Sequence, residues 1–219
     1  MPVSVLRALR AVALGWQWYR AALLLHIAYF GLLRPGEVCA LRRSDILLRQ
    51  SAWGMEMLIR MERTKSWSRG ARSQYAKVDA LQCCEFCNRF VKSMSPGMRL
   101  WPGTPSLFAR RLEMLLKAAT FQPGPYTPGS LRCGGATHLF LEWEESLQKL
   151  CWRGRWQNLT TLWHYVQELQ SIAILQQYSA PVQQRVSDLA GLLDELVLEL
   201  CATEVAAETY YRFCFSCSC

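Results

Sequence analysis

Histidine is scarce in this sequence, and the metal-binding patterns that depend on it are missing. Only three histidines occur among the 219 residues, and they are scattered along the chain. The ten cysteines do not form the paired clusters that a four-ligand zinc site requires. We therefore expect no metal and no small-molecule cofactor, and reduced thiols in an intracellular protein. A cysteine-rich zinc-binding interaction protein is kept as an alternative, with ligands at Cys83, Cys84, Cys87 and the tail cysteines.

Long apolar runs are missing as well. The apolar segment at residues 21–33 is 13 residues long and contains His26, whereas a membrane-spanning helix needs about 20 apolar residues. A buried core helix is the better interpretation. Near the N-terminus, Gln17 and Arg20 interrupt a short apolar run, which does not fit a signal peptide. We expect no membrane association.

Charge is abundant but unevenly distributed. Residues 1–165 carry 23 Lys or Arg against 10 Asp or Glu, whereas residues 166–219 carry 2 against 7. A basic body with an acidic C-terminal segment is typical of a domain that binds a polyanion and whose tail docks on protein. A basic solvated surface without a nucleic-acid partner explains the charge equally well.

Periodicity and chain breakers predict a mainly α protein with a small antiparallel β-sheet, an α+β fold. Strand patterns occur at residues 45–49, 55–61 and 73–78, and the polar segment 65–72 reads as a hairpin connection. Helical patterns precede and follow these strands, and proline and glycine separate the helices from one another. The predicted helices are at residues 18–33, 37–41, 80–94, 105–120, 130–150, 158–170 and 182–202.

Two arginines stand at predicted helix ends. Arg34 follows an apolar helix and precedes Glu37, whose carboxylate can brace the guanidinium. Ser130 is the expected N-cap of a helix whose first turn presents Arg132, and the glycines after it allow close backbone packing. An arginine at a helix N-terminus suits a phosphate. An ordinary surface arginine and a glycine-rich helix contact are the alternative interpretations.

A third segment is Gly154-Arg155-Trp156, with Tyr165 nine residues after the tryptophan. A lone tyrosine on a helix usually belongs to the core. In order and spacing, however, these three segments together with the hairpin lysine, Lys65, resemble the tyrosine recombinase, or phage integrase, family. The resemblance covers residues 20–170 and implies the catalytic-domain fold of that family. Ser-Leu-Arg-x-Gly-Gly-Ala-Thr with a later Gly-Arg-Trp looks most like the recombinases of eukaryotic mobile elements, the DIRS and Crypton groups.

The resemblance implies a catalytic set consisting of Arg34, Lys65, Arg132, Trp156 and Tyr165. The two arginines would clamp the non-bridging oxygens of a DNA phosphate, and the tyrosine would attack phosphorus to form a 3′-phosphotyrosyl link. The lysine would protonate the departing 5′-oxygen, and the indole N–H would donate to a phosphate oxygen. Glu37 would support the site, and the expected DNA contacts are Arg42, Arg43, Arg63, Arg69, Arg72 and Arg155.

One position departs from the family pattern. Gly129 stands three residues before the second arginine, where most members have a histidine that assists proton transfer. His138 lies on the other side of Arg132, and His164 adjoins the tyrosine but is expected to face elsewhere. Loss of a general base costs about 100- to 10,000-fold in rate. A catalytically inactive DNA-binding relic is therefore the second hypothesis.

The resemblance also implies an organisation and partners. Residues 1–19 are expected to be the remnant of an N-terminal linker, because the helical domain that usually precedes the match is missing. Residues 171–219 form a helical tail, exchanged between protomers or packed in cis. The expected partners are double-stranded DNA and other copies on DNA, in the nucleus if the source is eukaryotic.

Overall fold

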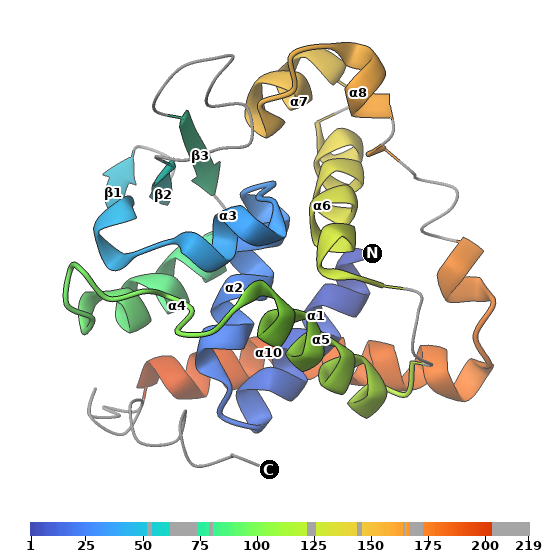
Figure 1. Ribbon diagram of the computed structural model, residues 1–219. Coiled ribbons are helices and arrows are strands. Elements are labelled where there is room, and N and C mark those ends of the chain that lie inside the picture. Colours follow the sequence, from blue (N-terminus) through green and yellow to red (C-terminus); the bar gives the residue numbers. More distant parts are fainter. Residues whose placement is uncertain are drawn as a thin grey trace.

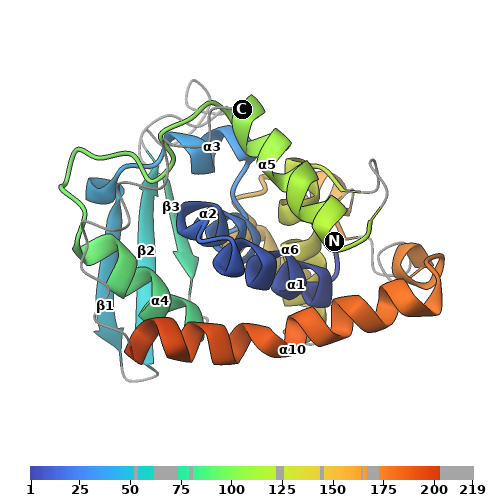
Figure 2. The same ribbon diagram turned by 90° about the horizontal axis from the view of Figure 1, so that it is seen from below.

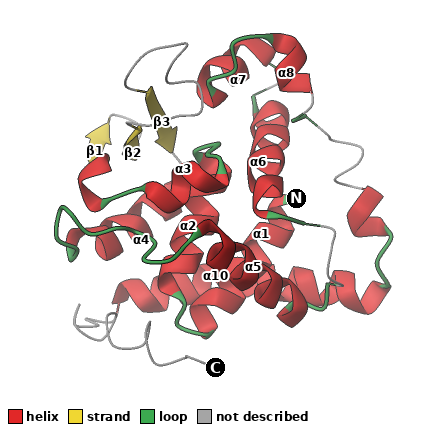
Figure 3. Ribbon diagram, viewed as in Figure 1, coloured by secondary structure: helices red, strands yellow, loops and turns green. Residues whose placement is uncertain are grey.

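Helices form most of the chain, and a small sheet lies on one side (Figure 1; coloured by type in Figure 3). This computed structural model describes residues 1–51, 54–61, 74–78, 81–121, 126–143, 146–163, 165–166 and 173–202. The helices are α1 Val3–Gly15, α2 Tyr19–Phe30, α3 Pro35–Ala40, α4 Leu81–Lys92, α5 Pro105–Ala118, α6 Pro128–Glu142, α7 Leu147–Gly154, α8 Leu159–Trp163 and α10 Ala180–Ala202, with a 3₁₀ turn η1 at Arg43–Asp45. The expectation of a mainly α protein is confirmed.

α2 is the central helix because it is apolar on every side. Each of its residues from Arg20 to Tyr29 is buried, and helices α1, α3 and α6 all contact it. A helix that is hydrophobic all round satisfies its surface only when neighbours enclose it. Figure 2 shows α2 between the sheet and α6.

The sheet is antiparallel with strand order β1-β2-β3, as the alternating pattern predicted. Its strands are β1 Ile46–Ser51, β2 Gly54–Met61 and β3 Gln74–Val78. In β2, Met57, Ile59 and Met61 are buried while Arg60 is exposed, because successive side chains of a strand point to opposite faces. α4 covers β2 on the buried face.

α1 was not predicted as an element, since residues 1–19 were expected to be a linker remnant. In the structure α1 is a buried helix that packs along α2 and α10 (Figure 2). Its apolar residues Val5, Leu6 and Leu9 are fully buried in the main core. α10 thus packs in cis on α1, and Arg7 donates to Asp194 Oδ2 at 2.7 Å across this contact. The domain boundaries themselves stay a prediction.

The helix expected at residues 130–150 is two helices. α6 ends with Trp143 at its C-cap and α7 begins after Ser146. The break lets α7 fold back over α6, so that Leu139, Phe140, Leu150 and Trp156 share a second, smaller core. In the described part of the chain, no helix has both the length and the apolar character needed to cross a bilayer.

Candidate anion-binding and catalytic site

Glu37 lies at the centre of the site, and the local sequence explains why. Pro35 starts α3 and places Glu37 at the third helical position, where its carboxylate accepts the backbone N–H of Arg34 at 2.8 Å. The other carboxylate oxygen accepts from Arg34 Nη1, also at 2.8 Å. The predicted bracing of Arg34 by Glu37 is therefore present in the geometry.

Arg132 approaches the same carboxylate from α6. Its Nη1 lies 3.7 Å from Glu37 Oε2, and its Nη2 donates to the carbonyl of Gly154 at 2.8 Å. The side chain is only 2% exposed. The expected N-cap was wrong: Thr127 caps α6, and the hydroxyl of Ser130 accepts the Thr127 N–H from the third helical position. Arg132 is therefore in the second turn, deeper in the protein than a first-turn residue.

The glycines after Arg132 provide the close packing that was expected of them. A Cβ on Gly134 would collide with the carbonyl oxygen of Met1, and one on Gly135 with that of Tyr29. α6 can therefore lie directly against α1 and α2. This close approach brings Arg132 to the end of α2, where α3 begins.

Arg155 is a third arginine of the cluster and was expected only as a DNA contact. It is the C-cap of α7 and has a left-handed backbone, with φ of 60°. Its Nη2 donates to Glu37 Oε2 at 3.1 Å and to the carbonyl of Leu32 at 3.3 Å. Arg155 thus ties the end of α7 to the end of α2 and to Glu37. Its position could not be found from the sequence, because glycine is the usual residue at such a cap.

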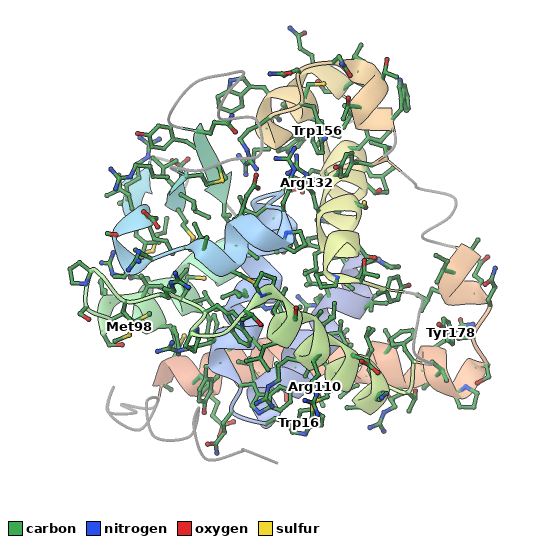
Figure 4. All side chains as sticks on the ribbon, in the orientation of Figure 1. Trp16, Met98, Arg110, Arg132, Trp156 and Tyr178 are labelled. Atoms are coloured by element: carbon green, nitrogen blue, oxygen red, sulfur yellow. The ribbon has the colours of Figure 1, made fainter. Side chains whose placement is uncertain are left out.

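Trp156 and Tyr165 complete the cluster. Their ring centroids are 5.0 Å apart, and the guanidinium carbon of Arg132 lies 4.8 Å from the Trp156 ring and 5.3 Å from the Tyr165 ring. The hydroxyl of Thr137 donates to the backbone carbonyl of Tyr165 at 3.3 Å, which fixes the turn after α8. Trp156 is buried, whereas Tyr165 is half-buried and so is not sealed in the interior. Figure 4 shows Arg132 and Trp156 close together between α6 and α7.

Gly154 was not singled out, although two features of the site depend on it. Its carbonyl accepts from Arg132, and a Cβ at this position would fall within the ring of Trp156. Only glycine allows the indole to lie directly against the end of α7. The Gly-Arg-Trp motif contained this signal, but periodicity alone does not reveal it.

The charge of the cluster is unbalanced, with three guanidinium groups facing one carboxylate. Burial lowers the pKa of Arg132 to about 10, and the nearby charges of Arg34 and Arg155 act in the same direction. Burial also lowers the pKa of Arg155, while Glu37 opposes the shift. Arg132 therefore still carries its charge at neutral pH. An anion placed here would remove part of the repulsion.

Several N–H groups of the cluster lack a hydrogen-bond acceptor within the described ranges. They are Nε and Nη1 of Arg132, Nε of Arg155 and Nε1 of Trp156. An unsatisfied buried donor costs about 1–3 kcal/mol, so four of them next to excess positive charge favour an incoming oxyanion. These donors are of the kind that bind phosphate oxygens, and they lie beside the tyrosine.

The other predicted residues lie outside the cluster. Arg42 donates to the carbonyl of Gly97 at 2.7 Å, and Arg43 donates to that of Ile46 at 3.1 Å. Lys65, Arg63, Arg69 and Arg72 are outside the described residues. A groove of about 440 Å³ adjoins Glu37 and is lined by Arg42, Arg60, Arg99 and Asp45 among others. Arg60 and Arg99 were not predicted, although the outward position of Arg60 in β2 was readable from the alternation.

No imidazole stands in the place of the usual histidine. Gly129 is in the first turn of α6, and His138 lies two turns further on, 5.7 Å from the Phe30 ring and 3.6 Å from Glu142. Burial lowers the pKa of His138. His164 is outside the described residues. In the part of the chain that is described, no group of three or more His, Cys, Asp or Glu could hold a metal ion, while Cys214, Cys217 and Cys219 are not in that part.

The fold and the site define a helical domain with a small sheet and an arginine cluster beside a tyrosine. No protein-family model and no curated protein matches the sequence. Among solved structures, the XerA recombinase matches with a TM-score of 0.57 and 19% identity over 79% of this chain. The XerH site-specific recombinase, bound to its difH substrate in a pre-cleavage complex, matches with a TM-score of 0.59 and 15% identity over 81% of this chain.

These matches show that the chain has the fold of tyrosine recombinases. The chain spans 62% of the XerA chain and 52% of the XerH chain. The matched structures are Xer recombinases, and they do not support the expected closer resemblance to DIRS and Crypton elements. At these identities the likeness concerns fold alone.

Proposed function

We propose that this protein cuts and rejoins DNA by site-specific recombination through a 3′-phosphotyrosyl intermediate. The observation that carries the proposal is the convergence of Arg34, Arg132 and Arg155 on Glu37, next to Trp156 and Tyr165. These residues are distributed over more than half of the sequence. A structural role alone does not explain why Arg132, which is buried and has unsatisfied N–H groups, lies 5.3 Å from the ring of a half-buried tyrosine.

The phosphate oxygens are the proposed occupants of the cluster. Phosphodiesters resist nucleophiles because they are anionic, so neutralising their charge supplies much of the catalysis. Arg34 and Arg132 would bind the non-bridging oxygens, and Trp156 Nε1 would donate to one of them. Glu37 and Arg155 would hold the clamp in place. The expected direct contact of Arg155 with DNA stays a prediction.

In the proposed reaction the phenolate oxygen of Tyr165 attacks phosphorus. The bond from that oxygen to phosphorus forms while the bond from phosphorus to the 5′-oxygen breaks, and the departing oxygen takes a proton from Lys65. The phenol proton must leave as well. Gly129 provides no imidazole for this step, and we propose that water accepts the proton. We therefore expect slow cleavage.

A pool of nicked suicide duplexes with randomised sequence tests the proposal, because the target site is not known. Covalent protein–DNA adducts are isolated under denaturing conditions. The expected result is an adduct that disappears in Tyr165→Phe and persists in Tyr178→Phe. Tyr178 is a suitable control because it lies far from the cluster, against Phe121 (Figure 4). DNA binding without any adduct, at every protein concentration, contradicts catalysis.

That outcome would support the second candidate, a DNA-binding protein of the same fold without turnover. The observation that favours it is Gly129 in place of the usual base. Self-association on DNA, a nuclear location and descent from a DIRS- or Crypton-like mobile element are further proposals that rest on the same resemblance. α10 packs on α1 of the same chain, so exchange between protomers would require this contact to open.

A further inference from the structure

A second groove lies on the other side of Arg155, between the sheet and α7. Its volume is about 530 Å³, within the range of about 300–1,000 Å³ that is common for small-ligand pockets. It is lined from the strands by Arg49, Leu58, Gln74, Tyr75, Ala76 and Lys77, and from the α7 end by Trp152, Arg153 and Arg155. Figure 1 shows β3 and α7 next to each other at this place.

Two aromatic side chains in this groove are unusually exposed. Trp152 is 77% exposed and Tyr75 is 60% exposed. Large aromatic residues contribute to folding when they are buried, so neither side chain stabilises the core. They come from opposite walls, β3 and α7. Two exposed aromatic side chains among the residues that line a groove suit a flat ligand.

The groove also carries positive charge. Arg49 and Lys77 both pair with Glu56, at 2.8 Å and 2.6 Å. Hydrogen bonds from Lys77 and Arg49 hold the pKa of Glu56 below its usual value, so this carboxylate stays ionised. Glu56 offsets one of these charges. At the α7 wall, the charge of Arg155 is only partly offset, because it shares the Glu37 carboxylate with Arg34 and Arg132. A ligand that is flat and carries negative charge fits this combination.

Arg155 connects the groove to the arginine cluster. It lines the groove and donates to Glu37, so a ligand in the groove would lie beside a phosphate held by the cluster. A strand that is cut and joined to a new partner must leave its former complement. Unpaired bases therefore arise next to the reacting phosphate.

We infer that this groove holds an unpaired nucleobase next to the bound phosphate, stacked on Trp152 and Tyr75. The inference rests on the proposed function and adds a binding site to it. Base stacking on aromatic side chains tolerates any base, because every base has a flat π-face. The phosphates on either side of the base would lie near the arginines at the α7 wall.

The test compares two short fluorescent DNA duplexes of equal length, one fully paired and one with a single bulged nucleotide. Binding is measured by fluorescence anisotropy with wild type, Trp152→Ala, Trp152→Phe and Tyr75→Ala. Trp16→Ala is the matched control, since Trp16 is also exposed, at 43%, and lies at the opposite end of the molecule (Figure 4). Thermal unfolding checks that each variant is folded.

We expect wild type to prefer the bulged duplex by about 5- to 100-fold, the range that corresponds to one stacked base. Trp152→Ala should bring this preference close to one and leave binding of the paired duplex unchanged. Tyr75→Ala should reduce the preference, while Trp152→Phe and Trp16→Ala should keep it.

Equal binding of both duplexes by wild type overturns the inference and leaves the proposed function intact. The inference also fails if Trp152→Ala weakens both duplexes equally, because the side chain then acts on ordinary duplex DNA. If wild type binds neither duplex, the proposed function itself fails. The three outcomes are therefore distinguishable.

Discussion

The arginines at the two ends of this molecule differ in how many of their N–H groups have hydrogen-bond acceptors. Arg7 at the contact between α1 and α10 uses Nε and Nη2 to donate to the carbonyl of Ala190 and to Asp194. Arg132 in the cluster is far more buried. Among the described residues it donates one hydrogen bond, to Gly154, and it forms a longer ion pair with a carboxylate that two other arginines share. Nε and Nη2 of Arg7 both have acceptors, whereas Nε and Nη1 of Arg132 have no hydrogen-bond acceptor among the described residues.

This difference separates a contact that stabilises the fold from an arrangement that is expected of an anion-binding site. A partly exposed ion pair with a single partner contributes little but costs little. A buried cluster with excess positive charge is costly unless an anion completes it. The cluster therefore lowers the stability of the fold, and apolar burial between α1 and α10 compensates for part of this loss.

The largest expected effect follows from removing the shared carboxylate. Glu37→Gln keeps the shape and the capping of α3 but leaves Arg34, Arg132 and Arg155 without a counter-charge. We expect the free energy of unfolding to fall by about 3–5 kcal/mol, measured by urea denaturation.

Asp194→Asn is the matched change at the other end, where the pair is partly exposed. It should lower the free energy of unfolding by about 1 kcal/mol or less. Equal losses in the two variants would refute the contrast between the ends.

Two glycine substitutions, one beside the cluster and one in α10, extend the comparison of the two ends. Gly154→Ala places a methyl group where the Trp156 ring lies, so the indole must move and the free energy of unfolding should fall by about 1–3 kcal/mol. Gly191 in α10 has nothing within 4 Å of the position of a Cβ. Gly191→Ala should instead raise that energy by about 0.5–1 kcal/mol, since alanine favours helix. Thermal and urea unfolding measure both, and a neutral Gly154→Ala would contradict the close packing.

His26 is a buried titratable residue of α2, and it gives a smaller, pH-dependent effect. Burial, and secondarily the charge of Arg10, lower its pKa well below 6.5. The unfolded chain therefore binds a proton that the folded chain excludes, and stability is complete above about pH 6.5. Below that pH the free energy of unfolding should fall by up to about 1.4 kcal/mol per pH unit.

His26→Phe should remove this contribution and keep an aromatic ring against Phe30. The measurement is urea unfolding of both proteins between about pH 7 and pH 5. Identical pH dependences of wild type and His26→Phe would show that burial does not lower the pKa of His26 in the folded protein.

Much of the fold was readable from local pattern. The partial alternation of residues 55–61 predicted β2, and α5 begins at Pro105 as expected. Pro35 and Pro128 were interpreted as chain breakers, but they are the first residues of α3 and α6. α1 was missed because an apolar run near the N-terminus was judged only as a signal peptide or a linker. The break between α6 and α7 was missed because the need of α7 to pack back on α6 is a tertiary requirement.

The candidate site was predictable in its membership but not in its arrangement. Arg34, Arg132, Trp156 and Tyr165 were selected by their order along the chain, and the structure brings them together. Their catalytic roles stay predictions, as does the role of Lys65. Arg155 was assigned to the DNA surface, since no pattern shows that a residue with left-handed backbone turns its side chain toward Glu37.

The sequence by itself determined the fold class, the small sheet and the residue types available for phosphate chemistry, because these depend on periodicity, chain breakers and composition. Only the tertiary structure decided that three arginines share one carboxylate and that two aromatic side chains flank a groove beside them. Such groupings depend on how α2, α6 and α7 pack against one another, and packing between distant segments leaves no local trace in the sequence.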